Sequence, residues 1–186
     1  MGTHENTVEE IMTLLAGSAS EAYYGEPVTQ LEHGLQAAQL ARDADADEET
    51  ILAALLHDVG HLLGHEGRIH EKLGVIDHDE AGAQWLRARG FSERLTALVR
   101  AHVDAKRYLV ATNAGYAARL SPASTETLAL QGGPMSPEEA QAFGADPMLK
   151  EKLRMRSWDE QAKIPGAAAA PLAEYRAMLL RHLQRG

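Results

Sequence analysis

Apolar residues recur at helical spacing along almost the whole chain, and the alternating pattern of strands is nearly absent. Two sequences of the form Thr-x-x-Glu predict helix starts, because each side chain can bond the backbone N–H of the other residue. They begin at Thr7, for a helix through Leu15, and at Thr29, for a helix to about Ala44. Asp47 is the predicted N-cap of the segment ILAALLHDVGHLL. Because that segment is almost entirely apolar, we expect it to be the buried central helix.

Serines, prolines and glycines mark further helix ends in the second half of the chain. The expected elements are a helix over 77–89 ended by Gly90, a helix from Ser92 toward Val110, helix starts at Ser121-Pro122 and Ser136-Pro137, a helix from Asp146-Pro147 through Lys163, and a last helix from Pro171. No domain boundary is indicated between them. The sequence therefore predicts an all-α fold, a single helical bundle spanning residues 1–186.

Composition narrows the possible partners. The formal net charge of −9 argues against nucleic acid, whose phosphates attract basic surfaces. The chain has no cysteine, so disulfides and thiolate metal sites are excluded. The N-terminal segment has no apolar signal core, and no run approaches the ~20 apolar residues of a membrane span. We therefore expect a cytoplasmic protein with no membrane partner; the sequence does not indicate its oligomeric state.

The pair His57-Asp58 lies within the most apolar segment of the chain. Burying an ionised carboxylate costs on the order of several kcal/mol unless the carboxylate is paired with a cation or bound to a metal ion. One interpretation is a buried hydrogen-bonded His–Asp pair. The other is a metal site, in which a carboxylate with two oxygens can bridge two ions.

Three further histidines favour the metal site. His33, His78 and His102 lie on different predicted helices, and the successive intervals through His57 are 24, 21 and 24 residues. Such intervals bring one side chain per helix into the interior of a bundle. With Asp159 of the segment RSWDE, the six predicted ligands describe a dinuclear site for iron, manganese or zinc. His4, His65, His70 and His182 lie in less apolar segments and are left unassigned.

Residues at helical spacing from these ligands suggest an anionic substrate. His61 follows His57 by four residues, Lys106 follows His102 by four, and Arg156 precedes Asp159 by three. A lysine and an arginine beside a metal pair can bind an oxyanion such as phosphate or phosphonate. Tyr23, Tyr24 and Glu26 belong to a glycine- and proline-containing segment that is expected to form a loop over the site.

The ordered set His…His-Asp…His…His…Asp resembles the HD-domain superfamily, and within it the oxygenase branch to which myo-inositol oxygenase is related. The resemblance extends to the PhnZ-type phosphonate oxygenases and covers the chain from about Tyr23 to Lys163. It is carried by the segments GEPVTQLEHGLQAA, LAALLHDVGH, HDEAGAQWLRARGFSERL, HVDAKRYLV, LQGGPMS and RSWDE.

The resemblance implies a mixed-valent Fe(II)/Fe(III) pair that uses O₂ as co-substrate. By similarity, His33, His57 and Asp159 hold one iron, His78 and His102 hold the other, and Asp58 bridges them. The family engages its phosphonate at the positions of Lys106, Ser124, Gln131 and Arg156. Tyr23 matches a tyrosine that occupies the open iron position, Glu26 its partner near the substrate amine, and His61 a histidine behind the ligands.

The implied reaction is oxidative cleavage of the C–P bond of a 1-hydroxy-2-aminoethylphosphonate, or of its N-trimethyl analogue, to phosphate and glycine or glycine betaine. Tyr24, beside Tyr23, adds a ring face that favours a trimethylammonium group, because aromatic faces attract cations. Two other functions remain open on the residues alone: a metal-dependent HD phosphohydrolase, and a non-catalytic helical module stabilised by metal.

Overall fold

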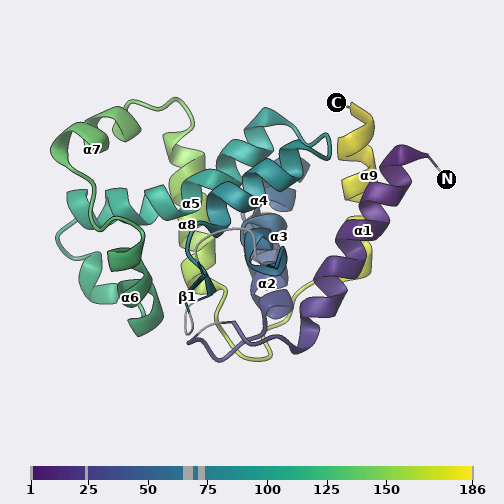
Figure 1. Ribbon diagram of the computed structural model, residues 1–186, viewed down its shortest axis with the longest axis horizontal. Helices are drawn as coiled ribbons and strands as arrows, with labels where there is room; N and C mark the ends of the chain where they lie inside the picture. Colours follow the sequence, from purple (N-terminus) through teal and green to yellow (C-terminus); the bar gives the residue numbers. More distant parts are fainter. Residues whose placement is uncertain (1, 24, 65–68, 71–73, 186) are drawn as a thin grey trace.

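The computed structural model describes residues 2–23, 25–64, 69–70 and 74–185, and it is predominantly helical (Figure 1). Tyr24 and His65 fall outside the described residues. In chain order the elements are α1 (Thr3–Gly17), η1 (Ser18–Ser20), α2 (Gln30–Asp43), α3 (Glu48–Leu56), η2 (Val59–Leu62), β1 (Ile69–His70), β2 (Gly74–Val75), α4 (His78–Arg87), α5 (Glu93–Thr112), η3 (Ala117–Arg119), α6 (Pro122–Leu130), α7 (Pro137–Gly144), α8 (Leu149–Gln161), η4 (Leu172–Tyr175) and α9 (Arg176–Arg185).

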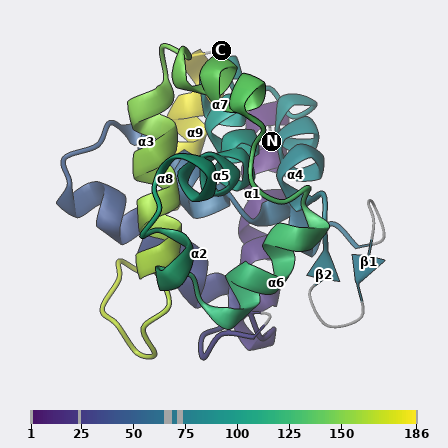
Figure 2. The ribbon, with the colours of Figure 1, turned by 90° about the vertical axis from the view of Figure 1, so that its left-hand side faces the viewer.

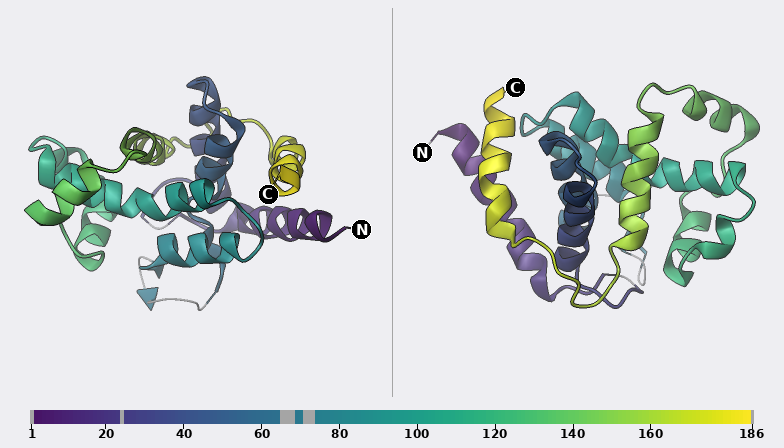
Figure 3. Two further views of the ribbon diagram at one scale, coloured as in Figure 1. Left: turned by 90° about the horizontal axis from the view of Figure 1, so that it is seen from above. Right: turned by 180° about the vertical axis from the view of Figure 1, so that it is seen from behind.

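Five helices form the centre of the molecule: α2, α3, α4, α5 and α8 (Figures 1 and 2). The first and last helices, α1 and α9, pack side by side at one end, so the two chain termini lie near each other. Helices α6 and α7 lie at the opposite end, beyond α8, as the view from behind shows (Figure 3). This arrangement confirms the predicted all-α fold. The described strands form one short antiparallel pair in which Ile69 faces Val75.

The core forms where the apolar faces of these helices meet. Helix α3 is buried along its length from Thr50 to Leu56, as expected for the most apolar segment. Its side chains pack with fully buried residues of α5 and α8, among them Leu95, Leu98 and Met155. Burial of this kind stabilises a helix far more than its intrinsic propensity does. Within the described residues, no helix is both long enough and apolar enough to cross a lipid bilayer.

Most predicted helix starts are confirmed. Thr29 forms the complete reciprocal cap with Glu32, at 3.1 and 2.8 Å. Ser92, Ser121 and Ser136 each accept a backbone N–H three residues later.

The predicted helix start at Thr7 is wrong. Helix α1 begins at Thr3, and the Thr7 hydroxyl donates to the Thr3 carbonyl oxygen. No breaker lies between these residues, so the helix extends one turn further upstream.

Three other boundaries differ from expectation, and two of the differences affect the site. The last helix, α9, begins at Arg176 and not at Pro171, because residues 172–175 form the separate turn η4. The central helix ends at Leu56, before His57-Asp58, and continues only as the separate turn η2. Helix α8 begins at Leu149 and ends at Gln161, so it includes neither Asp146 nor Lys163. Lys163 therefore lies in the connection that follows α8.

Asp47 caps the buried helix α3 as predicted, and its replacement is expected to destabilise the fold. Its carboxylate accepts the Thr50 N–H at 2.9 Å and binds Arg94 through both oxygens, at 3.0 and 2.9 Å. We expect Asp47→Ala to lower the free energy of unfolding by about 1–2 kcal/mol, measured by urea denaturation. Asp47→Asn keeps the capping oxygen and should lose less. Equal losses in both variants would show that the ion pair dominates over the cap.

Candidate functional site

A sharp turn after α3 presents His57 and Asp58 to the same region. His57 keeps helical backbone angles, whereas Asp58 lies outside the helix with φ −102° and ψ 11°. The turn packs closely against the start of α4, since a Cβ on Gly60 would lie only 1.9 Å from the His78 carbonyl oxygen. Glycine is therefore required at position 60, and its absence of a side chain brings His78 next to Asp58.

Four side chains form a first cluster: His33 from α2, Asp159 from α8, and His57 and Asp58 from the turn after α3. The Nε2 atoms of His33 and His57 lie 3.0 Å apart. Asp58 Oδ2 is 3.4 Å from each of them. Asp159 Oδ1 completes the cluster at 3.4 Å from His33 Nε2.

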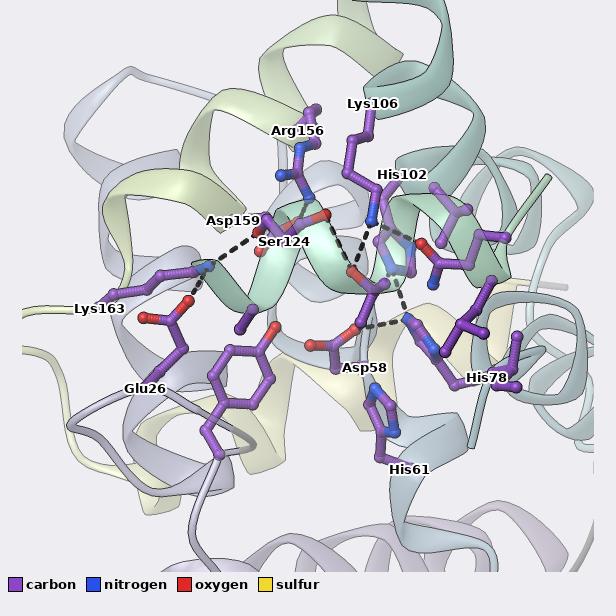
Figure 4. A pocket seen from close by; sticks show the side chains of 17 residues that line it. Glu26, Asp58, His61, His78, His102, Lys106, Ser124, Arg156, Asp159 and Lys163 are labelled. Atoms are coloured by element: carbon purple, nitrogen blue, oxygen red, sulfur yellow. Dashed lines mark hydrogen bonds and ion pairs between the residues drawn. The ribbon is translucent and has the colours of Figure 1, made fainter. Parts of the chain in front are cut away.

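A second cluster lies on the other side of Asp58. The Nε2 atoms of His78 and His102 lie 2.9 Å apart. Asp58 Oδ1 is 3.2 Å from the first and 3.3 Å from the second. Each oxygen of Asp58 thus faces one pair of histidines, which is the arrangement of a bridging carboxylate. Figure 4 shows Asp58 beside the second pair, His78 and His102.

Backbone contacts identify the tautomers of three of these histidines. The Nδ1 atoms of His33, His57 and His102 lie 2.6–2.8 Å from the carbonyl oxygens of Ala162, Ala54 and Val99. A carbonyl can only accept, so each Nδ1 carries a proton and donates it, which leaves a lone pair on Nε2 whenever the ring is neutral.

The donor atoms therefore fit metal ions. In the first cluster, the Nε2 atoms of His33 and His57 lie 3.0 Å apart, and the lone pairs of the neutral rings repel unless a proton or a metal ion lies between them. Buried Asp58 Oδ2 also receives no hydrogen bond from the described residues. Two groups of three donors, one with His33 and His57 and one with His78 and His102, share Asp58. Imidazole and carboxylate ligands in this number suit iron, manganese or zinc.

The electrostatics are those of an anionic site. Burial disfavours the charged form of Asp58, but the neighbouring histidines, His57 foremost, hold its pKa well below the usual value. Burial is likewise outweighed at Asp159, where Arg156 contributes most to the low pKa. Both carboxylates are ionised at neutral pH. The two carboxylates raise the pKa of His33 to about 9 against the opposing effect of burial, so the site attracts positive charge.

The clusters open into a cavity of about 60 Å³. Apart from His33 and His57, which lie behind it, and Tyr24, outside the described residues, every predicted site residue lines this cavity. The lining contains Tyr23, Glu26, Asp58, His61, His78, His102, Lys106, Ser124, Gln131, Arg156 and Asp159. The sequence predicted His61 on the same helix as His57. His61 lies instead in η2, where its ring stacks on that of His78 with centroids 3.9 Å apart.

Lys106 is a buried cation on the wall of the cavity. Its ammonium donates to Gln131 at 2.5 Å and to Thr127 at 2.9 Å. Burial and then the positive charge of Arg156 lower the pKa of Lys106 to about 7. Gln131, predicted as a substrate contact, thus holds the lysine in place.

Arg156 offers an unused donor in the same cavity. Its Nε donates to the Tyr116 hydroxyl and to Glu160, at 3.0 and 2.9 Å, and its Nη1 donates to Asp159. Its Nη2 has no hydrogen-bond partner among the described residues, although the side chain is buried. A buried guanidinium N–H without an acceptor is costly, which indicates a site for an anion.

Tyr23 covers the first cluster. Its ring stacks on that of His33, with centroids 4.0 Å apart and planes inclined by 14°. Burial and then the negative charge of Asp58 raise the pKa of its phenol well above the ordinary value, so the hydroxyl keeps its proton at neutral pH.

Sequence reasoning missed Lys163, which also lines the cavity. Its ammonium lies 2.7 Å from Glu26 Oε1. A signal was available, because Lys163 follows Asp159 by four residues, the same spacing that pointed from His102 to Lys106. Tyr116 and Glu160, which hold Arg156, were missed as well, and the pattern contains no signal for Tyr116.

The chain is similar to known proteins along most of its length. The HD-domain family model matches residues 31–147. Hydroxymethylphosphonate dioxygenase of Gimesia maris is 43% identical over 157 residues, which is 83% of this chain and 78% of that protein. The glycine-betaine-forming [1-hydroxy-2-(trimethylamino)ethyl]phosphonate dioxygenase of Leisingera caerulea is 44% identical over 159 residues, 85% of this chain and 81% of its own length.

A third relative is an uncharacterised protein of Acanthamoeba polyphaga mimivirus, 36% identical over 178 residues, which cover 95% of this chain and 81% of that one. The family model and the two dioxygenases agree with the histidine–aspartate clusters and with the resemblance noted from the sequence. The chain therefore belongs to the HD-domain family and, within it, to the metal-dependent phosphonate dioxygenases.

Proposed function

We propose that this protein uses O₂ to cleave the carbon–phosphorus bond of a 1-hydroxyphosphonate, with two iron ions as its cofactor. The reaction R–CH(OH)–PO₃²⁻ + O₂ → R–COO⁻ + H₂PO₄⁻ balances in atoms and charge. The four electrons that reduce O₂ come from the C1–H and C1–P bonds. The observation that carries the proposal is the position of Asp58, whose two oxygens face two histidine pairs beside a cationic cavity.

In this proposal the two clusters are the two iron sites. His33, His57 and Asp159 would hold one ion, His78 and His102 the other, and Asp58 would bridge them. The iron pair supplies the redox chemistry by which O₂ reacts with C1.

The remaining side chains bind and orient the substrate. Lys106 and the free Nη2 of Arg156 would bind the phosphonate oxygens, together with the Ser124 hydroxyl on the same wall. Tyr23, which keeps its proton and stacks on His33, would cover the site and limit the entry of water. His61, stacked on His78, would fix the orientation of that ring.

We further propose that residues 1–186 work as one domain. Helix α8 lies outside the segment 31–147 matched by the family model, yet it carries Asp159 and Arg156. The matched segment alone would lack one carboxylate of the first cluster.

Dependence on O₂ tests the proposal. The protein, loaded with iron and given a 1-hydroxyphosphonate, should release phosphate in air, with one O₂ consumed per phosphate, and release none under strict anaerobiosis. Elemental analysis of the purified protein should find two iron ions per chain. Phosphate release without O₂ would instead indicate a hydrolase, and metal binding with no turnover of any hydroxyphosphonate would indicate a structural metal site.

A further inference from the structure

Lys163 is held in the cavity by its two neighbours along the chain. The carbonyl oxygen of Ala162 accepts the His33 Nδ1 proton at 2.8 Å. The Gln36 side-chain amide bonds the backbone of Ile164 twice: its oxygen accepts the Ile164 N–H at 3.1 Å, and its nitrogen donates to the Ile164 carbonyl oxygen at 2.8 Å. Helix α2 thus fixes the connection on either side of Lys163. A lysine on a surface loop has no such support.

The ammonium of Lys163 has three polar or aromatic neighbours inside the cavity. It lies 2.7 Å from Glu26 Oε1 and 3.3 Å from Ser124 Oγ. It also lies 5.8 Å from the centroid of the Tyr23 ring. Figure 4 shows Lys163 and Glu26 facing each other at one side of the cavity. Both side chains are largely buried, with 13% and 9% exposed.

A carboxylate beside an aromatic ring is the environment that binds a ligand ammonium group. Here the protein's own cation takes that position. Glu26 is engaged further by the Ser121 hydroxyl, which donates to the same oxygen at 2.6 Å. Both donors bind Oε1, so a substrate nitrogen would compete with Lys163 for this oxygen.

We propose that Lys163 determines specificity by occupying the position of a substrate's cationic nitrogen, so that the enzyme selects 1-hydroxyphosphonates without an ammonium group. The simplest such substrate is hydroxymethylphosphonate, in which C1 carries no further carbon; its products are formate and phosphate. This inference rests on the proposed function, and it favours a substrate other than the amino and trimethylammonio compounds expected from the sequence.

The charge of the cavity opposes displacement of Lys163. If a substrate nitrogen took its place beside Glu26, the Lys163 ammonium would remain near Lys106 and Arg156, two further cations that line the cavity. Lys163 and Arg156 already act on Lys106 as like charges and contribute to its lowered pKa. A bound trimethylammonium group would add another positive charge to this set. Two buried like charges repel strongly because little water screens them.

The size of the cavity points in the same direction. A volume of about 60 Å³ corresponds to roughly four to six water-sized groups, at about 10–15 Å³ for each. Hydroxymethylphosphonate has one carbon and no nitrogen. The trimethylammonio compound adds a second carbon and a quaternary nitrogen with its methyl groups, so it needs more of this space than hydroxymethylphosphonate does.

The test compares hydroxymethylphosphonate, its 2-aminoethyl analogue (2-amino-1-hydroxyethylphosphonate) and the trimethylammonio analogue on the iron-loaded enzyme. We expect kcat/KM for hydroxymethylphosphonate to exceed the other two at least about tenfold. Lys163→Met frees Glu26 and should shift the ratio toward the 2-amino compound by about tenfold or more. Calorimetric titration without O₂ should give the same order of Kd values, independent of turnover.

Three further variants make the result specific to the charge. Lys163→Arg keeps a cation beside Glu26 and should keep the wild-type order. Glu26→Gln removes the carboxylate and should weaken the aminated substrates further. Lys150→Met, on the exposed face of α8, is the control and should change nothing.

Each outcome has one meaning. A wild-type enzyme that prefers either aminated compound would overturn the inference while supporting the proposed function. So would a substrate order that is unchanged in soluble Lys163→Met, or one that changes equally in Lys163→Arg. If the wild-type enzyme releases phosphate from none of the three compounds in air, the proposed function itself fails.

Discussion

Replacing Asp58 by asparagine is expected to lower C–P cleavage by at least about 100-fold and to leave no more than one metal ion bound per chain. Loss of a partner behind a metal ligand typically costs about 10- to 100-fold in affinity or activity. Asp58 stands closer to the metals than that, since its two oxygens lie 3.2–3.4 Å from four histidine nitrogens. Asparagine keeps one oxygen, so it can serve only one cluster, and it lacks the negative charge.

Metal content and activity should be measured on the same preparations. Asp43→Asn is the matched control, because Asp43 is an exposed aspartate at the end of α2 that accepts a hydrogen bond from Gln39 at 2.7 Å. It should keep two ions and full turnover. If Asp58→Asn binds two ions and retains activity, Asp58 is no bridge and the two clusters do not act together.

The sequence was sufficient to predict the all-α fold and to bring together the residues of both clusters. The reason is that the relevant signals are local. Burying the ionisable pair His57-Asp58 in an apolar segment costs free energy unless the pair is hydrogen-bonded or binds metal. Serine caps such as Ser92 mark helix starts because the side chain bonds a backbone N–H within the same turn. The intervals of 24, 21 and 24 residues between successive histidines then place His33, His78 and His102 in the interior of one helical bundle.

What the sequence could not give depends on contacts between distant segments. The break after Leu56 is set by the approach of Gly60 to the backbone of His78, which no periodic pattern expresses. The end of α8 before Lys163 is set by contacts with His33 and Gln36 on α2. Glu26 was expected beside a substrate amine, but its partner in the fold is Lys163, 137 residues away along the chain.

The cavity combines two opposite fields. Asp58 and Asp159 make the metal clusters anionic, whereas Lys106, Arg156 and Lys163 add positive charge to the wall beside them, where Arg156 pairs with Asp159. An anionic substrate without cations of its own fits between bound metal ions and these side chains. Since the net charge of the protein is −9, this local concentration of positive charge is what admits a phosphonate.

Replacing Lys106 by methionine is expected to raise the KM for the phosphonate about 10- to 150-fold while metal content stays the same. The loss corresponds to about 1.5–3 kcal/mol, typical of a hydrogen bond to a charged group. Among the described residues, Lys106 donates to Gln131 and Thr127 and makes no hydrogen bond or ion pair with a predicted metal ligand, so its removal should leave the two clusters intact. Arg100→Met, on the exposed side of the same helix, is the control.

The pH profile separates this role from a structural one. Because burial and Arg156 lower the pKa of Lys106 to about 7, its ammonium is charged below pH 7 and loses its proton as the pH rises above 7. Binding of an anion favours the charged form, so kcat/KM of the wild-type enzyme should fall above pH 7. The substrate's own ionisation is the same in both proteins. The extra fall should therefore disappear in Lys106→Met, and a profile identical to that of the wild type would contradict a direct contact between Lys106 and the phosphonate.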